Sequence, residues 1–123
     1  MMPLDVFERK LSLLRDVAKD IRETSKKVNA IDAGVNISSN LNATFRIVLE
    51  IEEVLIRKEV CFELNFDKSS LRFWLKGTKY SYNKSFPLNG KVVSKIGDIV
   101  LRYAEKFDND DGLEVVVEDL LEG

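Results

Sequence analysis

Histidine is absent from the 123-residue sequence, and cysteine occurs once, as Cys61. The absence of histidine excludes catalytic triads with an imidazole base, histidine metal ligands and histidine pH switches. A single cysteine cannot form an intramolecular disulfide or a multi-cysteine zinc site. Because Cys61 lies in the middle of an expected strand, with no histidine to activate it, we interpret it as a structural thiol.

Long hydrophobic runs are also missing, since no apolar stretch approaches the roughly 18 residues of a membrane-spanning helix. The first residues do not combine a basic region with an apolar stretch, so we expect no secretory signal and a cytoplasmic protein. The composition, 45% hydrophobic and 33% charged, is typical of a folded chain rather than a disordered one. At this length we expect a single domain over residues 1–123.

Motifs that bind nucleotides or calcium are incomplete. The segments around Gly77 and Gly90 lack the glycine spacing, and the Ser or Thr after lysine, of a phosphate-binding loop. If Gly112 stood at the sixth position of an EF-hand loop, the first ligand would be Phe107, which has no side-chain oxygen. We therefore predict no cofactor and no bound metal, and an enzyme is the third and least favoured hypothesis.

The net charge of −2 is unevenly distributed along the chain. Residues 67–107 carry nine basic and three acidic side chains, a balance of +6, whereas residues 108–123 carry seven acidic and no basic ones, a balance of −7. The favoured interpretation is that this acidic tail lies against the basic block or aids solubility. The alternative is that the basic block binds an anionic partner.

A long helix is predicted over residues 6–31, with Asp5 as its N-cap and Gly34 as a stop signal. Its apolar residues recur at spacings of four and three, which is a heptad pattern. The seam consists of Phe7, Leu11, Leu14, Ala18, Ile21 and Val28. The helix either lies across a sheet of the same chain or packs against a second copy of the protein.

An antiparallel sheet of three or four strands is predicted over residues 44–86, after a polar connector at 35–42. Residues 52–59 fit either a strand or a helix. In the remaining runs every second residue is apolar, and a four-residue loop at 67–70 and a Gly77-Thr78 turn set the pairing. The expected opposite pairs are Phe66–Leu71, Leu64–Phe73, Phe62–Leu75, Leu75–Tyr80 and Phe73–Tyr82.

A second helix is predicted over residues 91–107, after Pro87 ends the last strand and Asn89-Gly90 opens the helix. Beyond it, residues 113–117 fit a short strand, whereas 116–121 fit a final helical turn. The expected fold class is α+β, with a long N-terminal helix, an antiparallel meander and a C-terminal helix. Both helices should pack on the sheet face that carries Phe62, Phe73 and Tyr82.

Basic and aromatic residues gather on the opposite face of this sheet. The candidate anion-binding or partner-binding surface consists of Arg72, Trp74, Lys76, Lys79 and Lys84. Phosphates pair with cations and bases stack on an indole, so single-stranded nucleic acid would suit such a surface. The favoured interpretation is structural: Trp74 shields part of the sheet, and the lysines prevent edge-to-edge aggregation.

These features together predict a small, non-catalytic protein-interaction module of the chaperone, adaptor or inhibitor kind. Its expected partner is another protein, and the seam of the first helix predicts a homodimer. Binding of single-stranded nucleic acid through the basic and aromatic sheet face is the alternative hypothesis.

Overall fold

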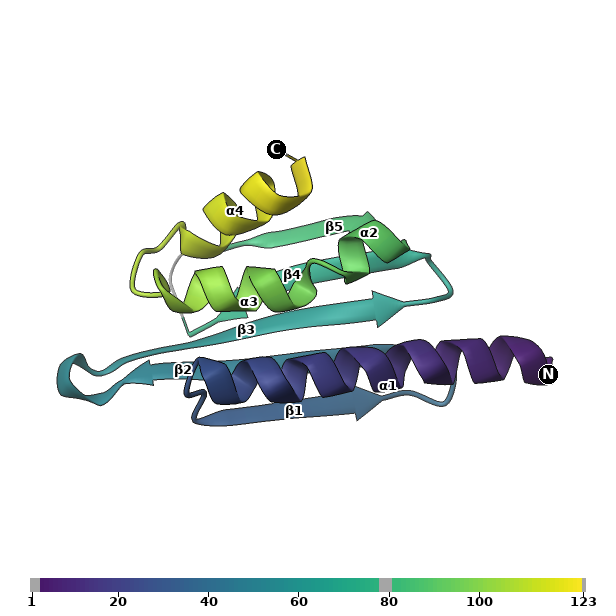
Figure 1. Cartoon of the computed structure of the whole chain (residues 1–123). Helices are drawn as coiled ribbons and strands as arrows, with labels where there is room; N and C mark the ends of the chain where they lie inside the picture. The colour runs from purple at the N-terminus through teal and green to yellow at the C-terminus, as the bar shows by residue number, and fades with distance from the viewer. Residues whose placement is uncertain (1–2, 78–80, 123) are drawn as a thin grey trace.

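The structure is a computed structural model that describes residues 3–77 and 81–122, with the side chain of Glu52 excepted. A long helix comes first, a five-stranded meander follows, and short helices close the chain (Figure 1). The elements are α1 (Leu4–Lys27), β1 (Asp32–Ile37), β2 (Ala43–Ile51), η1 (Glu52–Val54), β3 (Ile56–Asn65), β4 (Ser70–Lys76), β5 (Asn83–Pro87), α2 (Gly90–Val93), α3 (Ile96–Ala104), α4 (Gly112–Val117) and η2 (Glu118–Glu122). Within the described ranges, no helix is long and apolar enough to cross a membrane.

The helices α1, α2, α3 and α4 cover the same face of an antiparallel sheet with the strand order β1-β2-β3-β4-β5. In Figure 1, α1 runs in front of β1 and β2, whereas α2, α3 and α4 lie in front of β3, β4 and β5. This arrangement confirms the predicted α+β class and the predicted one-sided packing. Within residues 3–77 and 81–122, no helix lies on the other face of the sheet.

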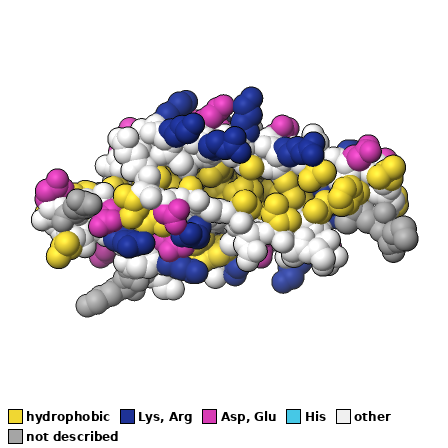
Figure 2. All heavy atoms as spheres, turned by 90° about the horizontal axis from the view of Figure 1, so that it is seen from below, with side chains coloured by type: hydrophobic (Ala, Val, Ile, Leu, Met, Phe, Trp, Pro, Cys, Tyr) yellow, Lys and Arg dark blue, Asp and Glu magenta, His cyan; other side chains and the backbone are white. Residues whose placement is uncertain are grey.

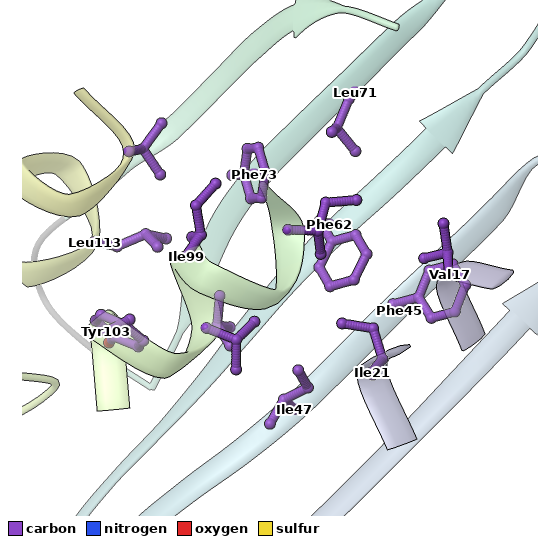
Figure 3. Close-up of a cluster of buried hydrophobic side chains, with 14 of the residues drawn as sticks. Val17, Ile21, Phe45, Ile47, Phe62, Leu71, Phe73, Ile99, Tyr103 and Leu113 are labelled. Atoms are coloured by element: carbon purple, nitrogen blue, oxygen red, sulfur yellow. The ribbon is translucent and has the colours of Figure 1, made fainter. Parts of the chain in front are cut away.

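The core lies between the sheet and the helices, and aromatic rings from neighbouring strands form its centre. Phe45, Phe62 and Phe73 are directly opposite one another in the register of β2, β3 and β4. The ring centroids are 5.0 Å apart for Phe45 and Phe62, and 6.0 Å apart for Phe62 and Phe73. Val17 and Ile21 of α1 pack beside Phe45 (Figure 3). Full burial of each such side chain contributes about 1.5–3 kcal/mol.

The N-terminal part of the prediction was wrong at both ends of the helix. Pro3 is the N-cap of α1, and Asp5 lies within its first turn. The helix ends at Lys27, followed by Asn29 with a φ of 55°, so Gly34 is not the stop. Residues 32–37 form β1, where the sequence suggested a connector from 35. The alternation of Val35 and Ile37 with Gly34 and Asn36 is short, and the Gly, Asn and Ser residues in and after it are typical of a loop.

The predicted sheet faces are confirmed, but the pairing of β3 with β4 is displaced by two residues. Phe62 is opposite Phe73 and Leu64 is opposite Leu71. A displacement of two residues leaves every side chain on its predicted face, so the alternation cannot detect it. The loop occupies residues 66–69 rather than 67–70, and Ser69 adopts a positive φ of 50°.

β5 pairs with β4 at a similar displacement, so that Lys84, and not Tyr82, is opposite Phe73. The predicted Gly77-Thr78 turn and the pairing of Tyr80 involve residues outside those that the structure describes. Between β2 and β3, the ambiguous segment 52–59 divides into η1 and the first residues of β3. Leu55, with a φ of 54°, separates the two.

The C-terminal helices differ from the single predicted helix at 91–107. Asn89 caps α2, its Oδ1 accepting a hydrogen bond from the backbone N–H of Val92, as predicted. The helix is interrupted at Ser94 and Lys95 before α3 begins. In the acidic tail the helical alternative is confirmed, because α4 and η2 cover residues 112–122. The apolar side chains that α4 buries are Leu113, Val116 and Val117.

Candidate functional site

The uncovered sheet face carries the basic and aromatic residues that the sequence singled out. The guanidinium carbon of Arg72 lies 4.2 Å from the centroid of the half-buried Trp74 ring. Arg72 is also 3.9 Å from the carboxylate of Glu63, and Lys76 is opposite Glu59 in the register. The structure therefore brings Arg72, Trp74 and Lys76 together, but beside carboxylates.

One of the predicted cations, Lys84, does not join this group. Lys84 points to the helix-covered face, where its ammonium group pairs with Glu122 and lies 5.6 Å from the centroid of the Phe86 ring. The sequence prediction for Lys84 was wrong because Lys84 is two residues from both Tyr82 and Phe86, and alternate residues of a strand share one face. Lys79 lies outside the described residues.

The uncovered face is balanced in charge over the described residues. Arg46 donates a hydrogen bond to Asp32 at 2.8 Å and is 3.8 Å from Glu59. The sheet register assigns four basic and four acidic side chains to this face: Arg46, Arg57, Arg72 and Lys76, and Asp32, Glu50, Glu59 and Glu63. The part of this face that the structure describes therefore offers a phosphate backbone no excess of positive charge.

Cys61 lies on this uncovered face and is only 2% exposed. Its Sγ is 4.0 Å from a carboxylate oxygen of Glu59. Burial, and then the negative charge of Glu59, raise the pKa of the thiol to about 11. The thiol is therefore neutral and a poor nucleophile near pH 7. Among the described residues, no group of three or more Cys, Asp and Glu side chains has the arrangement of a metal site.

The acidic tail lies against the rest of the chain, as the favoured interpretation expected. Arg102 donates a hydrogen bond to Asp119 at 2.8 Å, and Lys84 pairs with Glu122. The loop before α4 is held by the buried Lys58, whose ammonium group is 3.8 Å from Asp110 and 3.5 Å from the carbonyl oxygen of Asn109. Part of the basic block is thus neutralised within the molecule.

The predicted seam of the first helix divides between two surfaces. Leu14 and Ile21 are buried against the sheet of the same chain, together with Val17 and Thr24. Val28 lies beyond the end of α1 and is half-buried. The remaining seam residues are half-buried or exposed: Phe7, Leu11 and Ala18. The alternative in which the helix lies across its own sheet is therefore confirmed for the central residues.

A groove runs between α1 and β1, on the side of the helix where Ala18 lies. Its volume is about 540 Å³. Apolar side chains line its walls and floor: Ala18, Ile21, Ala30, Ala33, Val35 and Phe45. The exposed Arg22 and Lys26 of α1 form its polar rim, and Asp32 of β1 also lines it. Phe7 and Leu11 extend the apolar strip along α1, since spacings of four and seven keep residues on one side of a helix.

The groove is bordered by a free sheet edge. β1 pairs with β2 alone within the described chain, so its other edge has no strand partner there. Val35 and Ile37 are each 48% exposed, although their side chains are on the helix-covered face. Seen from the β1 side, a band of apolar side chains crosses the molecule below a row of Lys and Arg (Figure 2).

The two rim cations are not neutralised by the described part of the protein. Neither Arg22 nor Lys26 has a carboxylate within ion-pair distance among the residues that the structure places. Both side chains are exposed. Arg22 and Lys26 are four positions apart, so they lie on the same side of α1. The groove thus combines an apolar floor, an unpaired strand edge and an unmatched positive rim.

The sequence prediction did not find this groove, because it did not find β1. The available signal was the short alternation of Val35 and Ile37 with Gly34 and Asn36. Comparison with protein-family models, curated proteins and solved structures found no match to this chain. Evidence on function therefore comes from the geometry of the surface.

Proposed function

We propose that this protein is a non-catalytic module that binds another protein through the groove between α1 and β1. The observation that carries this proposal is the coincidence of an apolar groove with an unpaired strand edge. Contiguous exposed apolar surface marks interaction sites in folded proteins. Free edges are normally protected by lysine, proline or a covering segment, and β1 (Asp-Ala-Gly-Val-Asn-Ile) contains neither lysine nor proline.

A capture experiment tests this proposal with the full-length chain. The immobilised protein is exposed to a lysate of its source cell, and bound proteins are compared between wild type and Val35→Glu. The matched control is Val54→Glu, since Val54 is 58% exposed and lies in η1, away from the groove. We expect a protein that wild type and Val54→Glu retain and Val35→Glu loses. Retention that is equal in all three would overturn the proposal.

Binding of single-stranded nucleic acid is the second candidate, and the Arg72–Trp74 pair is the feature that favours it. The balanced charge of the uncovered face argues against it, because affinity for phosphate backbones depends on net positive charge. We expect no mobility shift of single-stranded DNA or RNA at low salt. A shift that weakens steeply with salt and is lost in Trp74→Ala would restore this candidate.

A further inference from the structure

We infer that the groove binds an extended segment of a partner protein, which adds as a sixth strand to the free edge of β1 and carries alternating apolar side chains followed by a carboxylate. The inference rests on the proposed function, and it specifies the shape and chemistry of the partner. Three features of the molecule support it: the backbone of β1, the side chains of β1 and the rim of α1.

The backbone of β1 fits an added strand. β1 is six residues long and extended, and it continues a sheet in which all neighbours are antiparallel. An extended peptide placed about 4.8 Å beyond β1 would satisfy the N–H and C=O groups of the free edge, which is how many domains bind peptides. A helix placed in the same groove would leave those backbone groups to water.

The side chains of β1 determine what the added strand presents on the helix-covered side. Ala33, Val35 and Ile37 are on that side, because their partners in β2 are the core residues Ile47, Phe45 and Ala43. Residues of an added strand that are opposite Val35 and Ile37 would lie against their exposed apolar surface. Apolar side chains at these two positions would complete the face that the helices leave open.

The rim of α1 determines the third position. The short connection from Lys27 to Asp32 brings the C-terminal end of α1 close to the start of β1, so Arg22 and Lys26 line the groove together with Ala33. Ala33 is small and leaves room opposite it for a longer side chain. A carboxylate at that position would pair with cations that have no ion pair among the described residues. In an antiparallel added strand the pattern reads apolar-x-apolar-x-acidic.

A second copy of this chain fits the groove less well. In a two-fold dimer with paired β1 edges, the side chains opposite Ala33, Val35 and Ile37 would come from the odd-numbered residues of the second β1, because opposite residues lie on the same face. These residues of β1 are Ala33, Val35 and Ile37, and none of them is charged. A second copy paired in this way would therefore offer no carboxylate to Arg22 and Lys26.

The test uses a synthetic peptide and the full-length protein. The probe is fluorescein-labelled Ser-Ile-Thr-Val-Thr-Glu-Ser, together with the reversed sequence for parallel addition, and fluorescence anisotropy measures binding. We expect one of the two to bind, with an affinity at least tenfold higher than that of the same peptide with Lys in place of Glu. Binding should weaken as salt rises, because the rim is exposed.

Two controls assign the binding to strand addition and to the rim. A peptide N-methylated at alternate residues, on the edge that would pair with β1, should lose binding by at least tenfold. In the double variant Arg22→Glu/Lys26→Glu, the Lys peptide should bind better than the Glu peptide. Both substitutions are at exposed positions of α1, so the core stays intact. Equal binding of the N-methylated peptide, or an unchanged preference in the double variant, would overturn the inference.

The capture experiment separates failure of this inference from failure of the proposed function. If no peptide binds but capture still depends on Val35, the partner has another shape and only the inference is overturned. If light scattering shows a dimer that Val35→Glu dissociates, the occupant is a second copy, and both the inference and the proposed binding of another protein through the groove are overturned. If neither peptide binding nor capture nor association depends on Val35, both are overturned.

Discussion

Among single residues that the structure describes, a few buried polar side chains lack a hydrogen-bond partner. Among the described residues, four enclosed side-chain atoms have no hydrogen-bond partner: Ser25 Oγ, Arg72 Nε, Tyr82 Oη and Tyr103 Oη. Burial, followed by the charges of Glu118 and Glu122, raises the pKa of Tyr82 to about 12. Burial alone raises the pKa of Tyr103 further. These hydroxyls are therefore neutral at physiological pH.

Ser25→Ala should stabilise the protein. The substitution removes a hydroxyl that is enclosed without a partner, and alanine has a higher helix propensity than serine at this position within α1. We expect the free energy of unfolding to rise by about 1 kcal/mol. Urea denaturation, compared between wild type and variant, measures it. A decrease in stability would show that the hydroxyl makes a favourable interaction.

Cys61 should make stability depend on pH in the alkaline range. Its pKa is raised from 9.0 to about 11 in the folded state, so the unfolded chain loses the proton first as pH rises. The contribution of the neutral thiol is fully present below pH 9 and is lost between pH 9 and 11. The stability difference between wild type and Cys61→Ala should fall across this range, a comparison that cancels tyrosine ionisation.

The same thiol should react slowly with disulfide reagents at pH 8. A pKa raised by two units lowers the thiolate fraction about 100-fold, and burial restricts access further. We expect the reaction of the folded protein to be at least 100-fold slower than that of the protein in urea. A folded-state rate close to that of the unfolded chain would contradict the burial of Cys61.

At the scale of elements, α1 serves two surfaces with one amphipathic pattern. Leu14 and Ile21 are buried, whereas Ala18 lines the groove beside β1, and Phe7 and Leu11 follow Ala18 along the same side of the helix. A heptad seam cannot distinguish these roles, since it records only that the residues are on one side of the helix. The sheet beneath the helix separates the two groups of seam residues. The central residues pack on its core, whereas Ala18 lies where the edge strand β1 leaves an open groove.

Substitutions within this seam should separate the two surfaces. Leu14→Glu places a charge at a position that is 3% exposed, and we expect it to destabilise the fold by more than about 4 kcal/mol. The matched control, Phe7→Glu, changes a residue of the same seam that is 39% exposed, and we expect a loss of less than about 1 kcal/mol. Circular dichroism during thermal unfolding measures both. Equal losses would contradict the division of the seam.

At the scale of the whole molecule, the sheet has one covered and one open face. The helices complete the core on the covered side, and paired charges occupy the open side. The acidic tail belongs to the covered side, since α4 places Leu113, Val116 and Val117 in the core. The tail is therefore part of the fold, and its ion pairs with Lys84 and Arg102 are at the surface.

Removal of residues 108–123 should abolish cooperative unfolding, because it exposes core side chains that α4 covers. The matched control keeps the tail and neutralises its ion pairs, as Asp119→Asn with Glu122→Gln. We expect this control to lose less than about 1 kcal/mol, because exposed ion pairs contribute little. Calorimetry compares the two. A truncated chain that unfolds cooperatively would show that the tail is a separable segment.

The alternation of apolar residues within 44–86 and the helical stripes on either side of it determined the fold class and the buried face of each element. Phe62, Phe73 and Ile99 are all in the core, as their spacing indicated. This succeeds because side-chain direction follows from local backbone geometry, with a period of two residues in strands and 3.6 in helices. Such information is present in any short window of the chain.

Packing between distant parts of the chain sets the register of β3, β4 and β5, the inclusion of β1 in the sheet and the position of the acidic tail. Displacing a strand by two residues preserves its faces. The alternation within β1 is short and stands among Gly, Asn and Ser residues, so it does not distinguish an edge strand from a loop. These features depend on partners distant in sequence. The groove depends on them all, since its two walls come from a helix and a strand whose relative position is determined by packing on the same sheet.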